Sequence, residues 1–236
     1  MTTGRILAAA LTLVLAVALG ASAREDAPPD TGEAQAACAI RPPEGFEPVR
    51  TVEVVAGAGL RVNGKPVLPL ANFYQSPKSF DNAAAMGLNC YFMPGATPPP
   101  KEYLDALLGK GLYGAVPWDA SAAGHPALLA WVQPHEPDRA FLLKDKPEMS
   151  PDRMAEAYRE IRAESRRPVV LDLSPEFMAG PDWTQNLTAG QKTEFYPKYA
   201  RAADILTYNV YPVWGHNRPD RLDWVADAAS DLRKLV

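Results

Sequence analysis

Short, mostly apolar runs alternate with amphipathic segments along most of the chain. The apolar runs predict strands, and the segments that repeat apolar residues at helical spacing predict helices. The six expected strands of this series cover residues 67–72, 88–93, 112–118, 128–133, 168–173 and 205–211. The expected helices cover residues 76–87, 100–108, 150–164, 191–202 and 219–235, and the last is expected to bury Leu222, Val225, Ala229 and Leu232.

A hairpin precedes this series. Residues 51–55 are typical of a strand, and residues 60–62 and 65–68 are separated by Asn63-Gly64. Asn-Gly is the strongest two-residue hairpin signal, because both turn positions need a positive φ.

Alternating strands and helices predict an α/β fold with a parallel sheet under helical cover. A doubly wound sheet binds its ligand at a switch point, often with a glycine-rich first loop, and no G-x-G-x-x-G follows any expected strand. A (β/α)8 TIM barrel instead gathers its site at the carboxyl ends of several strands. Polar and aromatic residues do gather there, which favours the barrel: Asn72, Trp118, Asp119, His135, Glu136, Asp172, Asn209 and Tyr211.

The number of units differs from that of a complete barrel. We find about six strand–helix units, where the barrel has eight, so we expect two open strand edges and an uncovered core. The simplest interpretation is a fragment that lacks strands seven and eight. The alternative is a partner, or an unusual closure, that completes the barrel.

The first 50 residues are expected to lie outside the barrel. Arg5, an apolar run over residues 6–19 and Ala21-Ser22-Ala23 predict a signal peptide over residues 1–23, and hence a secreted or periplasmic protein. A retained membrane anchor is the alternative, but the run is short for a bilayer span. Residues 24–50 are rich in Ala, Pro, Glu and Asp and predict a flexible linker. The barrel is expected over residues 51–236.

Charge and cysteine content narrow the function classes. The net charge of −4 has no basic stripe, so no nucleic-acid partner is expected. After signal cleavage, no further apolar run is long enough to cross a membrane, so no membrane association is expected. Cys38 and Cys90 either form a disulfide in an oxidising compartment or remain a tail thiol and a small buried strand residue. Metal spacings such as C-x-x-C are absent.

The most informative segment is His-Pro-Ala-Leu-Leu-Ala-Trp-Val-Gln-Pro-His-Glu-Pro-Asp, residues 125–138. A buried strand leads here into Glu136, which prolines flank. Because proline restricts its own φ and the preceding residue, we expect an extended Glu136 at a strand end, presented as a general acid. The competing interpretation is an exposed loop glutamate.

This segment resembles the "HPAL-x-x-W … D/N-E-P" segment of clan A glycoside hydrolases, the retaining barrel enzymes that include β-galactosidases, cellulases and mannanases. Further segments are similar to that family in the same order, over about residues 51–236: Arg61-Val62-Asn63-Gly64-Lys65-Pro66, Met86-Gly87-Leu88-Asn89, Lys110-Gly111-Leu112 and Ala203-Asp204-Ile205 with Asn209-Val210-Tyr211-Pro212. The resemblance implies an acid/base glutamate at Glu136. It also implies a nucleophile at the end of strand seven, which this chain does not reach.

The resemblance implies a glycoside hydrolase acting on a poly- or oligosaccharide without metal or organic cofactor. Substrate would be bound by His135, Asn209, Tyr211, Trp118 and Asp172. His135 stands where the family usually has Asn or Asp, and Asn209 replaces an acidic residue of related barrels. The rival hypothesis is a non-catalytic barrel that binds a carbohydrate or a protein.

Other candidates are weaker. Asp172 and Glu176 are possible second carboxylates, although an Asp at a strand end is more often a cap. Aromatic faces suit sugar rings, and Trp183 and Trp214 are candidates for that role, whereas Trp131 is expected in the core. The remaining residues of interest are His125 and His216, expected in loops, and Asn186-Leu187-Thr188, a glycosylation acceptor pattern.

Overall fold

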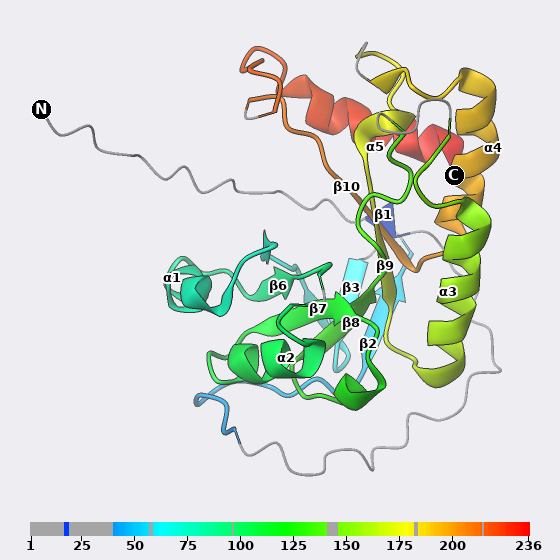
Figure 1. The fold of residues 1–236 in the computed structure, drawn as a ribbon. Coiled ribbons are helices and arrows are strands. Elements are labelled where there is room, and N and C mark those ends of the chain that lie inside the picture. Colours follow the sequence, from blue (N-terminus) through cyan, green and yellow to red (C-terminus); the bar gives the residue numbers. More distant parts are fainter. Residues whose placement is uncertain are drawn as a thin grey trace, which may run out of the picture.

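The computed structural model describes residues 17–18, 40–56, 59–95, 97–140, 146–181, 184–213 and 215–236. Its larger sheet curls into part of a barrel (Figure 1). In spatial order the strands are β1 (Val17–Ala18), β10 (Ile205–Tyr208), β9 (Val169–Leu173), β8 (Leu128–Val132), β7 (Tyr113–Pro117), β6 (Cys90–Phe92) and β5 (Ala71–Phe73).

The strand order separates the two expected architectures. The six strands from β5 to β10 are parallel and follow the chain without reversal, and β1 pairs antiparallel with β10. A doubly wound sheet reverses its order at a switch point, so that alternative is wrong. The chain forms an α/β half-barrel of six parallel strands, and β5 is the end of the described sheet.

Helices follow five of these strands. They are α1 (Phe80–Ala85), α2 (Pro100–Leu108), α3 (Pro151–Glu164), α4 (Ala189–Ala200) and α5 (Asp223–Leu235), with short 3-10 turns η2 (Pro77–Ser79), η3 (Ala120–Ala122) and η4 (Pro175–Phe177). The expected bounds of α2 and the expected end of α3 are confirmed. Ser150 caps α3 by accepting a hydrogen bond from the Arg153 amide, with proline at the first helical position.

Several expectations about single elements are wrong. The chain does not form one strand over 67–72, because β4 ends at Val67 and β5 begins at Ala71. Helix α4 begins before Gln191, because Thr188 and Gln191 form a reciprocal capping box. Leu222 is 62% exposed and Val225 only half-buried, and α5 buries Trp224 and Ala228 beside the expected Ala229 and Leu232.

Alternate residues of the strands enter different layers, as the two-residue strand period requires. The helix side of the sheet carries Tyr91, Trp131, Leu171 and Leu206, which pack in clusters with the buried faces of the helices. The concave side carries a third cluster, which includes Cys90, Ala115, Val170 and Ile205. The half-barrel therefore has an apolar inner face of mostly small side chains.

A second sheet packs against this inner face. It consists of β2 (Val52–Val55), β3 (Gly59–Val62) and β4 (Lys65–Val67), joined by the expected Asn63-Gly64 turn, where φ is 50° and 78°. Leu60 and Val62 join the concave cluster. The Arg167 guanidinium donates to the carbonyls of Val49 and Arg50. Val49 is buried, so the packed structure begins before Thr51.

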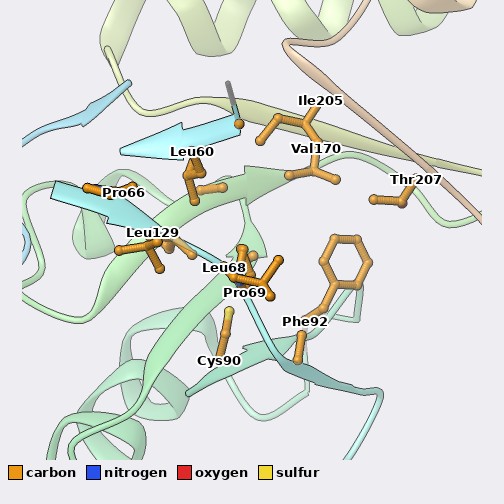
Figure 2. A pocket seen from close by; sticks show the side chains of 15 residues that line it. Leu60, Pro66, Leu68, Pro69, Cys90, Phe92, Leu129, Val170, Ile205 and Thr207 are labelled. Carbon is orange, nitrogen blue, oxygen red and sulfur yellow. The ribbon is translucent and has the colours of Figure 1, made fainter. Parts of the chain in front are cut away.

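The inner face remains partly open. A cavity of about 520 Å³ lies between the hairpin and the strands (Figure 2), lined by residues that include Leu60, Leu68, Cys90, Phe92, Val170 and Thr207. Leu68 is 74% exposed. The core is thus only partly covered, as expected, but the expectation of two open strand edges is wrong for β10, which pairs with β1.

Several expectations fall on the first residues. Apart from Val17 and Ala18, the expected signal peptide and most of the linker lie outside the described residues, as does Cys38. Cys90 is a buried thiol on β6, and its pairing with Cys38 stays a prediction. None of the helices in the described ranges is long and apolar enough to cross a membrane.

Gly114 permits close packing between β7 and α2. A Cβ atom at this position would lie 2.7 Å from side-chain carbons of both Leu104 and Leu107, which are fully buried. We predict that Gly114→Ala lowers the free energy of unfolding by about 1–3 kcal/mol through overpacking. Gly180→Ala is the matched control, because a Cβ there meets nothing within 4 Å. Equal stability of both variants in urea denaturation would contradict this packing.

Candidate functional site

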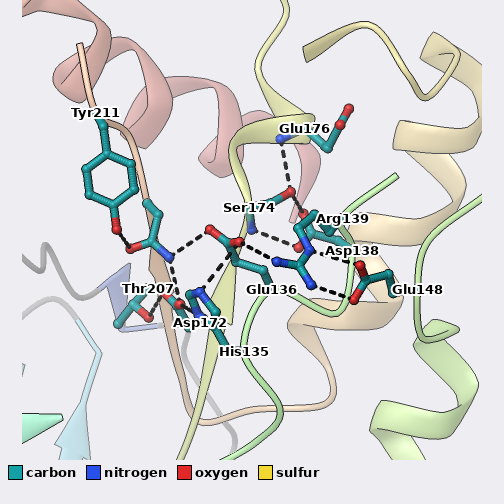
Figure 3. A network of polar contacts seen from close by, with 11 residues as sticks. His135, Glu136, Asp138, Arg139, Glu148, Asp172, Ser174, Glu176, Thr207 and Tyr211 are labelled. Atoms are coloured by element: carbon teal, nitrogen blue, oxygen red, sulfur yellow. Dashed lines mark hydrogen bonds and ion pairs between the residues drawn. The ribbon is translucent and has the colours of Figure 1, made fainter. Parts of the chain in front are cut away.

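Polar side chains gather where the concave face reaches the carboxyl ends of β8, β9 and β10 (Figure 3). Val170 and Ile205 line the apolar cavity. Two residues further along each strand, Asp172 and Thr207 point to the same side and are register partners. The inner face therefore changes from apolar to polar toward the rim on which barrel enzymes build their sites.

Asp172 is the centre of this network. Its side chain is 3% exposed. Its Oδ1 accepts a hydrogen bond from Thr207 at 2.9 Å, and its Oδ2 accepts one from Asn209 at 2.8 Å and lies 2.6 Å from His135 Nδ1. A buried carboxylate needs such partners to offset its desolvation. Asp172 thus joins the ends of three neighbouring strands.

Asn209 bridges two carboxylates. Its Nδ2 group donates to Asp172 Oδ2 at 2.8 Å and to Glu136 Oε1 at 2.9 Å. The Tyr211 hydroxyl donates to Asn209 Oδ1 at 3.0 Å, which fixes the orientation of the amide. An amide suits this place, because a carboxylate here would add a third negative charge and remove both donors.

The backbone of Glu136 corrects the expectation of an extended conformation. Its φ is +47°, in the left-handed region that side chains other than glycine rarely adopt. The flanking prolines restrict the chain, but tertiary contacts select the conformation. The Glu136 amide donates to the Asp172 carbonyl at 3.0 Å, and the Arg139 amide donates to the Glu136 carbonyl at 3.1 Å. Strain of this kind clusters at functional sites.

The Glu136 carboxylate faces the rim, with its side chain 13% exposed. Oε1 is held by Asn209, whereas Oε2 lies 3.5 Å from His135 Nε2 and 3.7 Å from Arg139 Nη1. Arg139 also forms a bidentate pair with Glu148 at 3.0 and 2.8 Å. Oε1 therefore faces the Asn209 amide, and Oε2 faces the His135 ring and the Arg139 guanidinium.

His135 lies between both carboxylates, and its ring is 5.3 Å from that of Phe73 at the end of β5. Burial opposes its protonation, but the hydrogen bond and charge of Asp172, followed by the charge of Glu136, outweigh this effect and raise the pKa of His135. With Nδ1 directed at Asp172, the Nε2 atom faces Glu136.

Asp138 fixes the position of the loop that follows β8. It is fully buried, and it accepts hydrogen bonds from the Ser174 amide at 2.8 Å, the Ser174 hydroxyl at 3.0 Å and the Tyr196 hydroxyl at 2.7 Å. Burial raises the pKa of Asp138 to about 7, against the opposing effect of these hydrogen bonds. Asp138 thereby joins the loop after β8 to the loop after β9 and to α4.

The structure brings together five of the six expected site residues, and Trp118 lies apart. The Trp118 ring packs edge-on against Trp131, 4.7 Å away, in the cluster on the helix side of the sheet. Sequence reasoning did not single out Thr207, Arg139, Asp138 or Phe73. The two-residue period from Ile205 through Thr207 to Asn209 is a signal that could have identified Thr207.

The weaker candidates lie elsewhere. Glu176 is buried beside α4 and accepts a hydrogen bond from Asn186 at 2.6 Å, so the expected glycosylation asparagine is engaged with it. His125 is buried and bonded to Asp105 at 3.1 Å, and the His216 ring lies 6.0 Å from the Trp224 ring. Trp183 and Trp214 lie outside the described residues.

Within the described ranges, no group of three or more His, Cys, Asp or Glu side chains is arranged to hold a metal ion. Comparison with protein-family models and with curated proteins found no match to this chain.

The bridging amide gives a direct test of the network. We predict that Asn209→Asp lowers the free energy of unfolding at pH 7 by at least about 3 kcal/mol, because two hydrogen bonds to charged groups are lost. The loss should shrink at pH 4, where the added carboxylate gains a proton. Asn217→Asp, at an exposed position, is the control. Equal urea midpoints for the two variants would show that the bridge is absent.

Asp138 gives a pH test. Because the pKa of Asp138 is raised on folding, the protonated Asp138 side chain stabilises the folded state fully below the ordinary pKa of 3.8. This contribution to the free energy of unfolding is lost as the pH rises through about 7. We predict that the stability of Asp138→Asn, relative to wild type, rises from pH 4 to pH 7 and then levels off. The measurement is urea denaturation at several pH values, with the exposed Asp227→Asn as control. A pH-independent difference would contradict the assignment.

Proposed function

We propose that this chain is an exported glycoside hydrolase of the retaining type, in which Glu136 is the general acid and base. The observation that carries the proposal is the partly exposed Glu136 carboxylate, which follows the carboxyl end of the fourth parallel strand and has its Oε2 3.5 Å from His135 Nε2. In the first step Glu136 would protonate the leaving glycosidic oxygen. In the second step it would take a proton from water.

The neighbours of Glu136 suit this role. Asn209 holds one carboxylate oxygen and leaves Oε2 for proton transfer. The strained φ of Glu136 implies that the surrounding structure imposes its position. Positioned proton transfer of this kind typically contributes about 10²–10⁴-fold to a rate.

The side chains at the rim are of the kinds that bind a pyranose ring. The Phe73 and Phe92 rings stack 5.4 Å apart beside His135, while Tyr211 closes the polar side through Asn209. Aromatic faces accept the C–H side of a sugar, and amide, imidazole and phenol groups can bind its hydroxyls. A poly- or oligosaccharide is therefore the proposed substrate.

The retaining mechanism also needs a nucleophile, with the two carboxyl groups about 5–5.5 Å apart. Asp172 is close enough, because its Oδ2 shares the Asn209 donor with Glu136. However, Asp172 is buried and its oxygens already meet three side chains, so we assign it to positioning. The proposal therefore requires a carboxylate from outside the described residues.

Glu136→Gln tests the proposal because it keeps the shape of the side chain and removes its titratable proton. We predict a loss of about 10²–10⁴-fold in kcat on substrates with poor leaving groups. The loss should be small for activated aryl glycosides, and azide should partly restore their turnover. Glu156→Gln, on the exposed face of α3, is the matched control. An unchanged rate for folded Glu136→Gln would exclude the assigned role.

A non-catalytic carbohydrate- or protein-binding barrel is the second candidate. It is favoured by the contacts of Glu136, because Asn209, His135 and Arg139 already engage its carboxylate, an arrangement that a binding site without catalysis can also use. This candidate predicts no hydrolysis of any aryl glycoside by wild type, together with calorimetric binding of an oligosaccharide that Glu136→Gln weakens.

A further inference from the structure

A general acid must hold a proton before it meets its substrate, and two neighbours of the Glu136 carboxylate are groups that only donate hydrogen bonds. Oε1 accepts a hydrogen bond from Asn209, and the Arg139 guanidinium lies 3.7 Å from Oε2. Neither the Asn209 amide nitrogen nor the Arg139 guanidinium can accept a proton or supply one that exchanges readily near neutral pH. The proton that the proposed function requires therefore needs another holder within reach of Oε2.

His135 occupies that position. Its Nε2 atom lies 3.5 Å from Glu136 Oε2, and catalytic hydrogen bonds often tighten from such distances only in the substrate complex. Its Nδ1 atom lies 2.6 Å from Asp172 Oδ2. Because Asp172 is a buried acceptor with Thr207 and Asn209 as its other donors, it keeps a proton on Nδ1. The second imidazole proton, on Nε2, is then the exchangeable one.

We propose that His135 and Glu136 share one proton, which His135 Nε2 holds at rest and passes to Glu136 Oε2 when substrate occupies the rim. The inference rests on the proposed function for the use of this proton. The N–H bond of Nε2 breaks as the O–H bond of Oε2 forms, and Glu136 then protonates the leaving oxygen as the glycosidic C–O bond breaks. In the second step Glu136 takes a proton from water, and this proton returns to Nε2.

The charged groups that face His135 support this assignment. Asp172 on β9 and Glu136 on its own loop favour the imidazolium, whereas Arg139 opposes it and is itself engaged by Glu148. Phe73 on β5 brings an uncharged ring. Burial raises the pKa of Tyr211, so its phenol stays neutral. Asp172 acts as the positioning residue for His135, and His135 as the positioning residue that holds the proton for Glu136.

The test begins with the titration of the histidine ring signals by NMR in the full chain. The sequence has three histidines, so loss of one signal in His135→Asn assigns His135, while His125 and His216 serve as internal controls. We expect Glu136→Gln to lower the pKa of His135 by about one pH unit, because a charge within a few ångströms is removed. Asp172→Asn should lower it as well, and Glu156→Gln should leave it unchanged.

The second measurement is the pH dependence of kcat/KM on an aryl glycoside with a poor leaving group. The basic limb of wild type should fall at the pH at which His135 titrates. Asp172→Asn should move the pKa of this limb and the pKa of His135 by the same amount. His135→Asn should remove this limb and lower kcat/KM by at least about tenfold, a share of the usual contribution of general acid catalysis. A purely structural role for His135 would lower the rate without moving the limb.

The outcomes separate the two proposals. An unchanged titration of His135 in folded Glu136→Gln, or an unchanged basic limb in His135→Asn, overturns the shared proton while leaving the glycosidase proposal intact. A lowered pKa of His135 in Glu136→Gln, together with no hydrolysis by wild type, supports the shared proton and overturns the proposed function. If Asp172→Asn does not fold, Glu136→Gln and His135→Asn decide the result alone.

Discussion

Burial of the Asp172 carboxylate is the constraint on which the rim of the half-barrel depends. A charge removed from water must be compensated by hydrogen bonds, and here the partners come from β10, from the residue after β10 and from the loop after β8. Each partner of Asp172 thereby acquires a fixed position. Asn209 then fixes Glu136 Oε1, and His135 directs its second nitrogen at Oε2.

The inner face provides the low-dielectric setting for this network. Apolar side chains and the β2–β3–β4 sheet line the amino-terminal part of the concave side, and polar side chains occur at the carboxyl end. Hydrogen bonds in such surroundings are stronger than in water, and an unpaired group there is more costly. At the polar end of this face, the Tyr211 hydroxyl donates to the Asn209 amide oxygen.

The strained backbone of Glu136 is held from two sides. On the concave side, its amide is fastened to the carbonyl of Asp172. On the helix side, Asp138 two residues later binds Ser174 and Tyr196. The strain, of order 1–3 kcal/mol, is thus maintained by contacts to β9 and α4 and not by the flanking prolines alone. The position of Glu136 therefore depends on residues of β9, of the loop after β9 and of α4.

Local signals were sufficient for much of the fold. The bounds of α2, the cap of α3 and the Asn63-Gly64 turn follow from backbone preferences that act within a few residues. The placement of Asp172, His135, Glu136, Asn209 and Tyr211 at one rim also follows from the sequence, because parallel strands bring their carboxyl ends to the same edge.

Only the tertiary structure decided which side chains meet. Trp118 was expected at the rim but packs on the helix side, because strand register and twist determine which face each residue joins. Leu222 was expected in the core but precedes the first turn of α5. The left-handed φ of Glu136 and the partners of Asp172 depend on atoms far apart in the chain, and the sequence alone does not bring these atoms into contact.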